Sequence, residues 1–207
     1  MKGTLPAQVF VDKLFSLLAG EPGVGVLYGP QGAYKTSLAL NLLKQESNRL
    51  PIYIATGKHL LIEVPPEIKV FKLRHIIDDI KVPFRLWHLS CTMGKSLIVV
   101  YDSFIANFAG ARGYLSSRAI LKSLVGCLEM LRHLARRRDA VVVLILPRHP
   151  ATGAPPLWRL IGRLVDRVVE IEVRDGVVSA VQRSVSLEPL TAWFIREGEL
   201  RDYVEDP

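Results

Sequence analysis

Apolar positions along the chain follow two patterns, a helical period and short continuous apolar runs. Residues 7–18 place apolar side chains at i, i+4, i+7 and i+8, which predicts a helix, and the Gly/Pro turn at 20–23 ends it. An apolar strand is predicted at 24–28, followed by a short glycine-bearing loop and a helix from 35 to about 49. Further apolar runs predict strands at 51–56, 69–73, 96–102 and 140–146. Such near-continuous apolar strands are typical of a sheet covered on both faces.

A long amphipathic helix is predicted after residue 116. Ser116 or Ser117 is a suitable N-cap, since serine hydroxyls accept hydrogen bonds from the free amides of a first turn. Apolar residues then recur at helical spacing at Ile120, Leu121, Leu124, Leu128, Leu131 and Ala135. The helix ends in a basic triplet, Arg136, Arg137 and Arg138. This triplet complements the helix dipole and equally suits contact with nucleic acid, and both interpretations stay open.

The last third of the chain changes pattern. A Pro/Gly-containing loop at 148–156 is followed by 158–164, which we expect to be a short helix or an ordered loop arm. Strands at 168–174 and 177–183 flank Asp-Gly, a strong hairpin signal. A second hairpin is predicted from 192–195 and 200–203 around Glu-Gly. The pattern therefore predicts an α/β body with a β-rich tail.

Length and composition place the chain among globular proteins. Its 207 residues are 49% hydrophobic and 23% charged, which suits a single domain spanning 1–207. We expect a soluble, cytoplasmic protein with no membrane association, since the longest apolar run is too short to cross a bilayer and the N-terminus lacks the apolar region of a signal peptide. Cys91 and Cys127 are far apart, with no CxxC motif and no nearby histidine pair, so we expect buried, reduced thiols.

Positive charge is concentrated in one part of the sequence. The formal net charge is +7, yet residues 112–167 alone hold eleven Lys/Arg against Glu129, Asp139 and Asp166, a local net of +8. Such an excess attracts polyanions, which favours nucleic acid as a partner. A solvated basic helix is the alternative explanation.

The loop between the first strand and the second helix carries a phosphate-binding pattern. Backbone amides of such a loop converge on phosphate oxygens, Lys35 reaches the outer phosphates, and Thr36 can ligate Mg²⁺. Tyr34 stands where the pattern has its second glycine, and we expect its ring to crowd the phosphates. The predicted nucleotide-binding residues are Gly29, Pro30, Gln31, Gly32, Ala33, Tyr34, Lys35, Thr36 and Ser37.

Asp102 is the predicted partner of this loop. It ends the apolar strand 96–102, so it should lie at the carboxyl edge of the sheet, where ligands of open α/β sheets bind. An aspartate there can hold Mg²⁺ through water. We therefore assign the catalytic role to Lys35 and Asp102 and the metal to Thr36 and Asp102, with ATP and Mg²⁺ as cofactors.

The succession of these segments resembles the RecA/RadA recombinase superfamily, most closely its archaeal RadA-like paralogues, over nearly the whole chain. The resemblance rests on the loop 29–36, the strand ending at Asp102, the long helix, the strand ending at 146–148 and the tail that ends near 206. It implies a RecA-like P-loop core with a mostly parallel central sheet, helices on both faces and C-terminal β-hairpins. It also implies single-stranded DNA and a full-length recombinase as partners.

Three departures from the family's pattern matter. Where the family has an Asp-Thr-Glu whose glutamate positions the attacking water, this chain has Ala55-Thr56-Gly57. Where the family has a glutamine that senses the γ-phosphate, this chain reads Leu146-Pro147-Arg148. The chain also leaves no room for the family's N-terminal domain, so no filament of its own is expected. Glu63, Asp78 or Asp79 are the candidates for a replacement base, and the spacing selects none of them.

By family position, 148–163 matches the second DNA-binding loop. Its basic and aromatic residues, the combination that single-strand binders use, are Arg148, His149, Trp158, Arg159 and Arg163. Trp158 can alternatively cover the sheet edge.

The leading hypothesis is an ATP-binding, DNA-interacting recombinase paralogue that modulates homologous recombination and DNA repair, with weak or absent ATP hydrolysis. The enzyme alternative is a working DNA-dependent ATPase with a relocated base. A small-molecule phosphotransferase is disfavoured, since no lid segment is visible in the sequence. An interaction module that binds no nucleotide is the remaining alternative, and Tyr34 is the residue that keeps it open.

Overall fold

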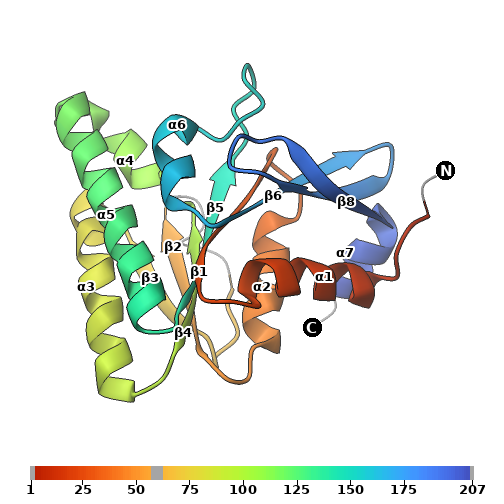
Figure 1. The fold of residues 1–207 in the computed structure, drawn as a ribbon, viewed down its shortest axis with the longest axis horizontal. Coiled ribbons are helices and arrows are strands. Elements are labelled where there is room, and N and C mark those ends of the chain that lie inside the picture. Colours follow the sequence, from red (N-terminus) through yellow and green to blue (C-terminus); the bar gives the residue numbers. More distant parts are fainter. Residues whose placement is uncertain (1–2, 57–62, 206–207) are drawn as a thin grey trace.

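The computed structural model describes residues 3–56 and 63–205. Within these residues, eight strands form one mixed sheet in the order β3-β2-β4-β5-β1-β6-β7-β8 (Figure 1). The pairs β6–β7 and β7–β8 are antiparallel, and the other pairs are parallel. The strands are β1 Gly23–Gly29, β2 Leu50–Thr56, β3 Lys69–Leu73, β4 Leu97–Asp102, β5 Val141–Pro147, β6 Arg167–Arg174, β7 Val177–Arg183 and β8 Pro189–Arg196.

Helices cover both faces of the sheet, as expected. α3, α5 and α6 pack on one face, and α1, α2 and α7 pack on the other, so the sheet separates two hydrophobic cores. The helices are α1 Ala7–Ala19, α2 Lys35–Gln45, α3 Ile76–Met93, α4 Ala106–Gly110, α5 Ser117–Arg137, α6 Trp158–Ile161 and α7 Glu197–Glu205, with 3-10 turns η2 Ala111–Gly113 and η3 Gly162–Leu164. None of the helices in the described part of the chain is both long and apolar enough to cross a lipid bilayer.

The α/β class, the mostly parallel sheet and the hairpin at its end are confirmed. β1, β4 and the first six residues of β5 are buried throughout, which matches their continuous apolar sequences. The Asp175-Gly176 turn joins β6 to β7, and both residues have positive φ, the conformation that an Asp-Gly pair tolerates. Ser116 is the N-cap of α5, where its hydroxyl accepts from the amide of Ala119.

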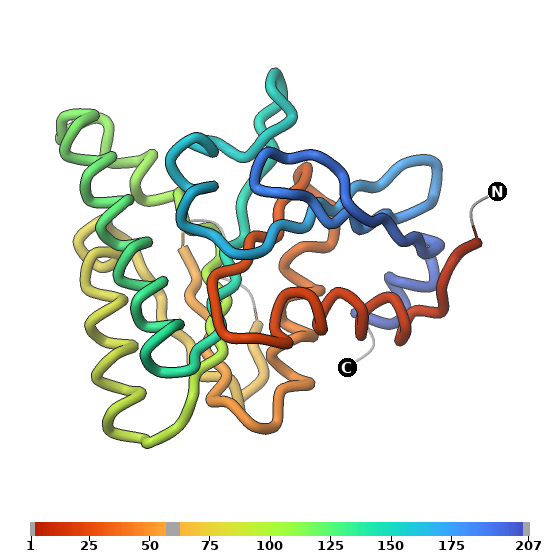
Figure 2. The backbone as a smooth tube through the Cα atoms, viewed as in Figure 1, coloured from red at the N-terminus to blue at the C-terminus, as the bar shows by residue number. Residues whose placement is uncertain are grey.

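The second predicted hairpin, with strands at 192–195 and 200–203, is wrong. β8 instead pairs antiparallel with β7, and the chain after it forms the helix α7. Leu200 is fully buried, and Tyr203 and Val204 pack beside it against the core that α1 and α2 cover, so the apolar period of this segment is helical. The two ends of the described chain therefore lie on the same side of the molecule (Figure 2).

The helix α3 was not predicted. Its apolar residues lie on two sides: Val82 and Leu86 are buried, whereas Ile77 and Phe84 are 59% and 60% exposed, and this distribution blurs the one-sided period that marks an amphipathic helix. Pro83 inside the helix is a further signal against helix.

The two cysteines differ in their surroundings. Cys127 on α5 is buried, as expected, and burial raises the pKa of its thiol to about 12. Cys91 is exposed on α3, so the expectation of burial is wrong for this residue. The error follows from α3, whose outer side carries apolar residues that the sequence alone assigns to a core.

Candidate functional site

The loop 29–34 leaves the carboxyl end of β1 and enters α2 in a conformation that depends on its glycines. A Cβ on Gly29 would lie 2.1 Å from the backbone oxygen of Ile171 on β6, so only glycine fits there. Gly32 has φ +80°, a conformation that favours glycine. The loop backbone is therefore shaped by close packing at one end and by a left-handed turn in the middle.

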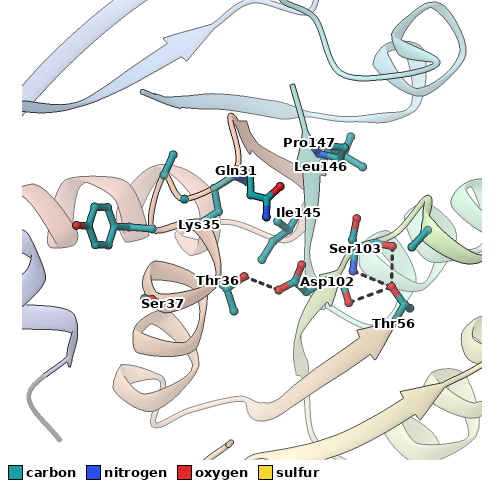
Figure 3. Close-up of a pocket in the computed structure, with 14 residues that line it drawn as sticks. Gln31, Lys35, Thr36, Ser37, Thr56, Asp102, Ser103, Ile145, Leu146 and Pro147 are labelled. Atoms are coloured by element: carbon teal, nitrogen blue, oxygen red, sulfur yellow. Dashed lines mark hydrogen bonds between the residues drawn. The ribbon is translucent and has the colours of Figure 1, made fainter. Parts of the chain in front are cut away.

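A cavity of about 570 Å³ lies beside this loop, at the carboxyl ends of the parallel strands (Figure 3). Its walls come from the loop and the first turn of α2 on one side and from the ends of β2, β4 and β5 on the other. The lining residues are Gln31, Gly32, Ala33, Tyr34, Lys35, Thr36, Ser37, Thr56, Asp102, Ser103, Ala106, Ile145, Leu146 and Pro147. The predicted nucleotide-binding residues from Gln31 to Ser37 thus share one cavity with Asp102. Gly29 and Pro30 lie at the base of the loop.

Lys35 begins α2 and lines the cavity from its first turn. Its ammonium group donates to the backbone oxygen of Pro30 at 2.5 Å, so the side chain lies across the inside of the loop. Burial lowers the pKa of the Lys35 amine, and the nearby Asp102 carboxylate acts in the opposite direction. The group is a cation beside free amides at a helix N-terminus, where an anion is stabilised.

Asp102 and Thr36 form a direct contact across the cavity floor. The Thr36 hydroxyl donates to Asp102 Oδ2 at 2.6 Å, and the Tyr53 hydroxyl on β2 donates to the same oxygen at 2.9 Å (Figure 3 shows the Thr36 bond). Asp102 is fully buried at the end of β4. The placement predicted for this aspartate, at the carboxyl edge beside the loop, is where it lies.

Thr36 and Asp102 offer two oxygen ligands that suit a magnesium ion. A hydroxyl and a carboxylate are the hard oxygen donors that Mg²⁺ prefers, and Mg²⁺ commonly takes its remaining ligands from water and substrate phosphates. Among the described residues, no group of three or more His, Cys, Asp or Glu gathers to hold a metal without such help. The ion would therefore bind here together with a phosphate-bearing ligand.

The side chain of Tyr34 points toward α7, whereas we expected its ring to crowd the phosphates. Its backbone takes the left-handed conformation (φ 54°), which costs a residue with a Cβ roughly 1–2 kcal/mol more than glycine. Its side chain packs beside the core that α1, α2 and α7 cover, and its hydroxyl donates to Glu197 Oε1 at 2.8 Å and accepts from Arg201 Nε at 3.2 Å. The hydroxyl end of the side chain is thus held by α7, away from Lys35 and Thr36.

Thr56 ends β2 where the family's pattern has carboxylates. Its hydroxyl accepts from the amide of Ser103 at 2.9 Å and donates to the Ser103 oxygen at 2.8 Å, which ties β2 to β4. Gly57 lies outside the described residues. Within the described chain, Asp102 is the only carboxylate residue that lines the cavity.

The candidate replacement bases lie elsewhere. Glu63 lines a separate hollow with Lys44 and Val204. Asp78 accepts from the amides of Arg74 and His75 at the start of α3. Asp79 is fully buried on the opposite face of the sheet.

The Asp79 side chain belongs to a buried polar cluster that sequence reasoning did not foresee. It accepts hydrogen bonds from the Tyr101 hydroxyl and from Asn107 Nδ2, the latter at 2.7 Å. Burial raises the pKa of Asp79 from 3.8 to about 6, against the effect of these two donors. No feature of the linear sequence marks this cluster, because its members lie on three different elements.

The predicted DNA-contacting residues fall into two groups. Arg148 pairs with Glu172 at 2.6 Å and with Glu170 at 3.6 Å on β6. Trp158 donates to the backbone oxygen of Val185 and packs on Gly162. Arg148 thus joins this segment to β6, and Trp158 joins it to the loop between β7 and β8. Trp158 also packs against the core that α3, α5 and α6 cover, which agrees with the alternative that it has a covering role. The other three, His149, Arg159 and Arg163, are exposed.

The basic triplet at the end of α5 also divides. Arg138 donates to the hydroxyl and the backbone oxygen of Ser90, so it joins α5 to α3. Arg136 lies 3.7 Å from Asp166 and is largely exposed, and Arg137 is exposed. One arginine of the three thus has a structural role, and two remain on the surface.

No protein-family model matches the sequence, and no curated protein is significantly similar to it. The functional argument therefore depends on the geometry of the site.

Proposed function

We propose that this protein is an ATP-binding, DNA-interacting paralogue of the RecA/RadA recombinases that modulates homologous recombination and DNA repair in the cytoplasm. Its core would be RecA-like, with the phosphate loop 29–36 cradling the nucleotide. Lys35 would neutralise the outer phosphates, and Thr36 and Asp102 would hold Mg²⁺.

One observation carries the nucleotide part of the proposal: the Thr36 hydroxyl lies 2.6 Å from Asp102 Oδ2 in a cavity that Lys35 also lines. Asp102 is far in sequence from Lys35 and Thr36. At the N-terminus of α2 the three residues bring together a cation, free amides and two oxygen ligands for a metal ion. This set of groups suits a phosphate chain with its cation better than an uncharged ligand.

Weak or absent hydrolysis is supported by what stands around the cavity. Phosphoryl transfer to water needs a group that orients the attacking water. Thr56, at the end of β2, uses its hydroxyl on Ser103, and Asp102 is bonded to Thr36 and Tyr53. Binding without efficient turnover is the activity that this arrangement favours.

DNA contact is supported by exposed basic residues on the loop 148–164 and on α5. Arg159, Arg163 and Arg137 are exposed, and phosphate contacts of this kind weaken steeply with salt. An Arg159→Ala, Arg163→Ala double variant should bind single-stranded DNA several-fold more weakly and with a smaller salt slope. Binding that is indifferent to salt would contradict the DNA part of the proposal.

Association with a full-length recombinase is supported by the outer side of α3. Ile77, Ile80 and Phe84 are 59%, 38% and 60% exposed, and at i, i+3 and i+7 they lie on one side of the helix. A contiguous exposed apolar patch of this kind is typical of a protein contact. Lys81 and Arg85 are exposed on the same helix, which favours a partner surface that carries acidic residues. Phe84→Ser should weaken association with a purified recombinase and leave ATP binding unchanged.

The decisive experiment measures ATP binding by calorimetry and ATP turnover with and without single-stranded DNA. The proteins are wild type, Lys35→Ala and Asp102→Asn, with Lys44→Ala as a matched control because Lys44 is an exposed lysine at the far end of α2. Lys35-dependent binding with background turnover is the expected result. DNA-stimulated turnover that both site variants lose would make the protein a DNA-dependent ATPase. Absence of Lys35-dependent binding would leave an interaction module.

A further inference from the structure

Residue 34 is the hinge between the phosphate loop and α2, and its backbone conformation sets the direction of the residues that follow. Tyr34 has φ 54° and ψ 12° and directly precedes Lys35 and Thr36. Glycine adopts this left-handed conformation freely, whereas a tyrosine needs surrounding contacts to hold it. The contacts that hold it here come from the other end of the chain.

The side chain of Tyr34 is fixed by two residues of α7. Its hydroxyl donates to Glu197 Oε1 at 2.8 Å and accepts from Arg201 Nε at 3.2 Å. Glu197 and Arg201 also form an ion pair with each other at 3.3 Å, one helical turn apart. The three side chains thus form a closed polar triangle, with the ring of Tyr34 partly buried beneath it.

The helix α7 is itself anchored, so it can serve as a fixed support. The amide of Glu197 donates to the oxygen of Gly176 in the β6–β7 turn at 2.8 Å, and Leu200 is fully buried. Farther along, the Tyr203 hydroxyl accepts from Gln45 Nε2 at 2.8 Å, and Gln45 is the last residue of α2. α7 therefore contacts both ends of α2, at the N-cap Tyr34 and at the last residue, Gln45.

We propose that Tyr34 is a positioning residue and that α7, through Glu197 and Arg201, holds the phosphate loop in its binding conformation. The triangle takes over the role that a glycine at this position fulfils by its own conformational freedom. Nucleotide affinity then depends on a helix that does not touch the nucleotide. The inference rests on the proposed function, since it concerns the same cavity.

Two measurements test it on the full chain. The first is ATP affinity by calorimetry, and the second is amide hydrogen exchange of residues 31–36 without nucleotide, which reports the order of the loop directly. Tyr34→Phe and Glu197→Ala should each weaken ATP binding about fivefold, the effect of one lost hydrogen bond, and should speed exchange by a similar factor. Glu199→Ala is the matched control: Glu199 is an exposed glutamate in the same first turn of α7.

A glycine background separates positioning from general destabilisation. In Tyr34→Gly, the loop no longer depends on α7, so adding Glu197→Ala should change neither ATP affinity nor loop exchange. If Glu197→Ala still weakens binding in that background, or if loop exchange is unchanged in Tyr34→Phe, the inference is overturned. Lys35-dependent ATP binding that all the Tyr34 and Glu197 variants retain would overturn this inference alone. Faster loop exchange without any ATP binding in the wild type would overturn the proposed function and the affinity part of this inference, and would leave only the loop contact.

Discussion

Asp102 and Asp79 are both fully buried aspartates, and each accepts a hydrogen bond from a tyrosine hydroxyl on the sheet, Tyr53 for the former and Tyr101 for the latter. The two pairs lie on opposite sides of the sheet. On one side, Asp102 borders a cavity with Thr36 and Lys35. On the other, Asp79 is enclosed by α3, α4 and α5.

The comparison shows that a buried carboxylate does not by itself mark a functional site. Asp79 has a raised pKa, the property often used to find catalytic groups, yet it is fully buried and enclosed by Tyr101, Asn107 and Cys127. Asp102 borders a cavity with space for a ligand and lies near the ammonium group of Lys35. Opening, charge and partner residues together distinguish the two regions.

The largest expected effect concerns Lys35, the cation that lines the cavity beside Asp102. Lys35→Ala should weaken ATP binding roughly a hundredfold, because it removes charge-assisted bonds to phosphate. Asp79→Asn should change ATP affinity by no more than about twofold, which is less than the loss of one hydrogen bond typically causes. Calorimetric titration measures both. A large loss of affinity in Asp79→Asn would end the contrast between the two sides.

The second effect concerns Asp79 and is a pH dependence of the free energy of unfolding. The pKa of Asp79 is raised from 3.8 to about 6, so between these values the unfolded chain loses its proton before the native protein does. Stability therefore falls as pH rises through this interval, by about 3 kcal/mol in all, and stays level above it. Urea denaturation from pH 3.5 to 7 should show this slope in wild type and lack it in Asp79→Asn. Asp78→Asn serves as the control, and equal slopes in wild type and Asp79→Asn would contradict the assignment.

A third, smaller effect concerns magnesium. ATP affinity of wild type should fall about tenfold when EDTA removes the metal, since the ion would be held by Thr36 and Asp102 and would neutralise phosphate charge. In Asp102→Asn this difference should shrink to near unity, whereas Asp79→Asn should retain it. Titrations in parallel buffers with MgCl₂ or EDTA give the comparison, and an unchanged metal dependence in Asp102→Asn would argue against the metal assignment.

The smallest expected difference is between the two tyrosine hydroxyls. Tyr101→Phe should cost about 1–3 kcal/mol of unfolding free energy, because it removes one of the donors to an enclosed carboxyl. Tyr53→Phe should cost less, about 1 kcal/mol, since Thr36 still donates to the same oxygen of Asp102. Denaturation at pH 7 ranks the pair. The reverse order would mean that the cavity side is the more tightly enclosed of the two.

The sequence predicted the cavity side better than the enclosed side, for a physical reason. The loop 29–36 and Asp102 follow apolar strands directly, and the carboxyl ends of parallel strands meet at one edge, so their meeting could be inferred from the pattern. The Asp79 cluster and the Tyr34–Glu197 bond join residues on separate elements, and the latter spans 163 positions. Local periodicity carries no signal for such contacts.

The prediction of secondary structure was wrong at α3 and at α7 for a related reason. α3 has apolar residues on both its buried and its exposed sides, so no single stripe was visible, and α7 was assigned a strand period over a segment too short to decide between the two. Glu172, which forms an ion pair with Arg148, was likewise not anticipated. This contact gives Arg148 a structural role in its own loop, and its predicted contact with DNA stays a prediction.

The polar triangle of Tyr34, Glu197 and Arg201 has an evolutionary consequence. Since the tyrosine tolerates its left-handed backbone through the two partners on α7, substitution of either partner removes the reason to keep an aromatic residue at 34. Among descendants of a common ancestor, the three positions should therefore change together: glycine at 34 where the acidic and basic partners are lost, tyrosine where both are kept. Covariation of position 34 with positions 197 and 201 would then reflect this one contact between the two ends of the chain.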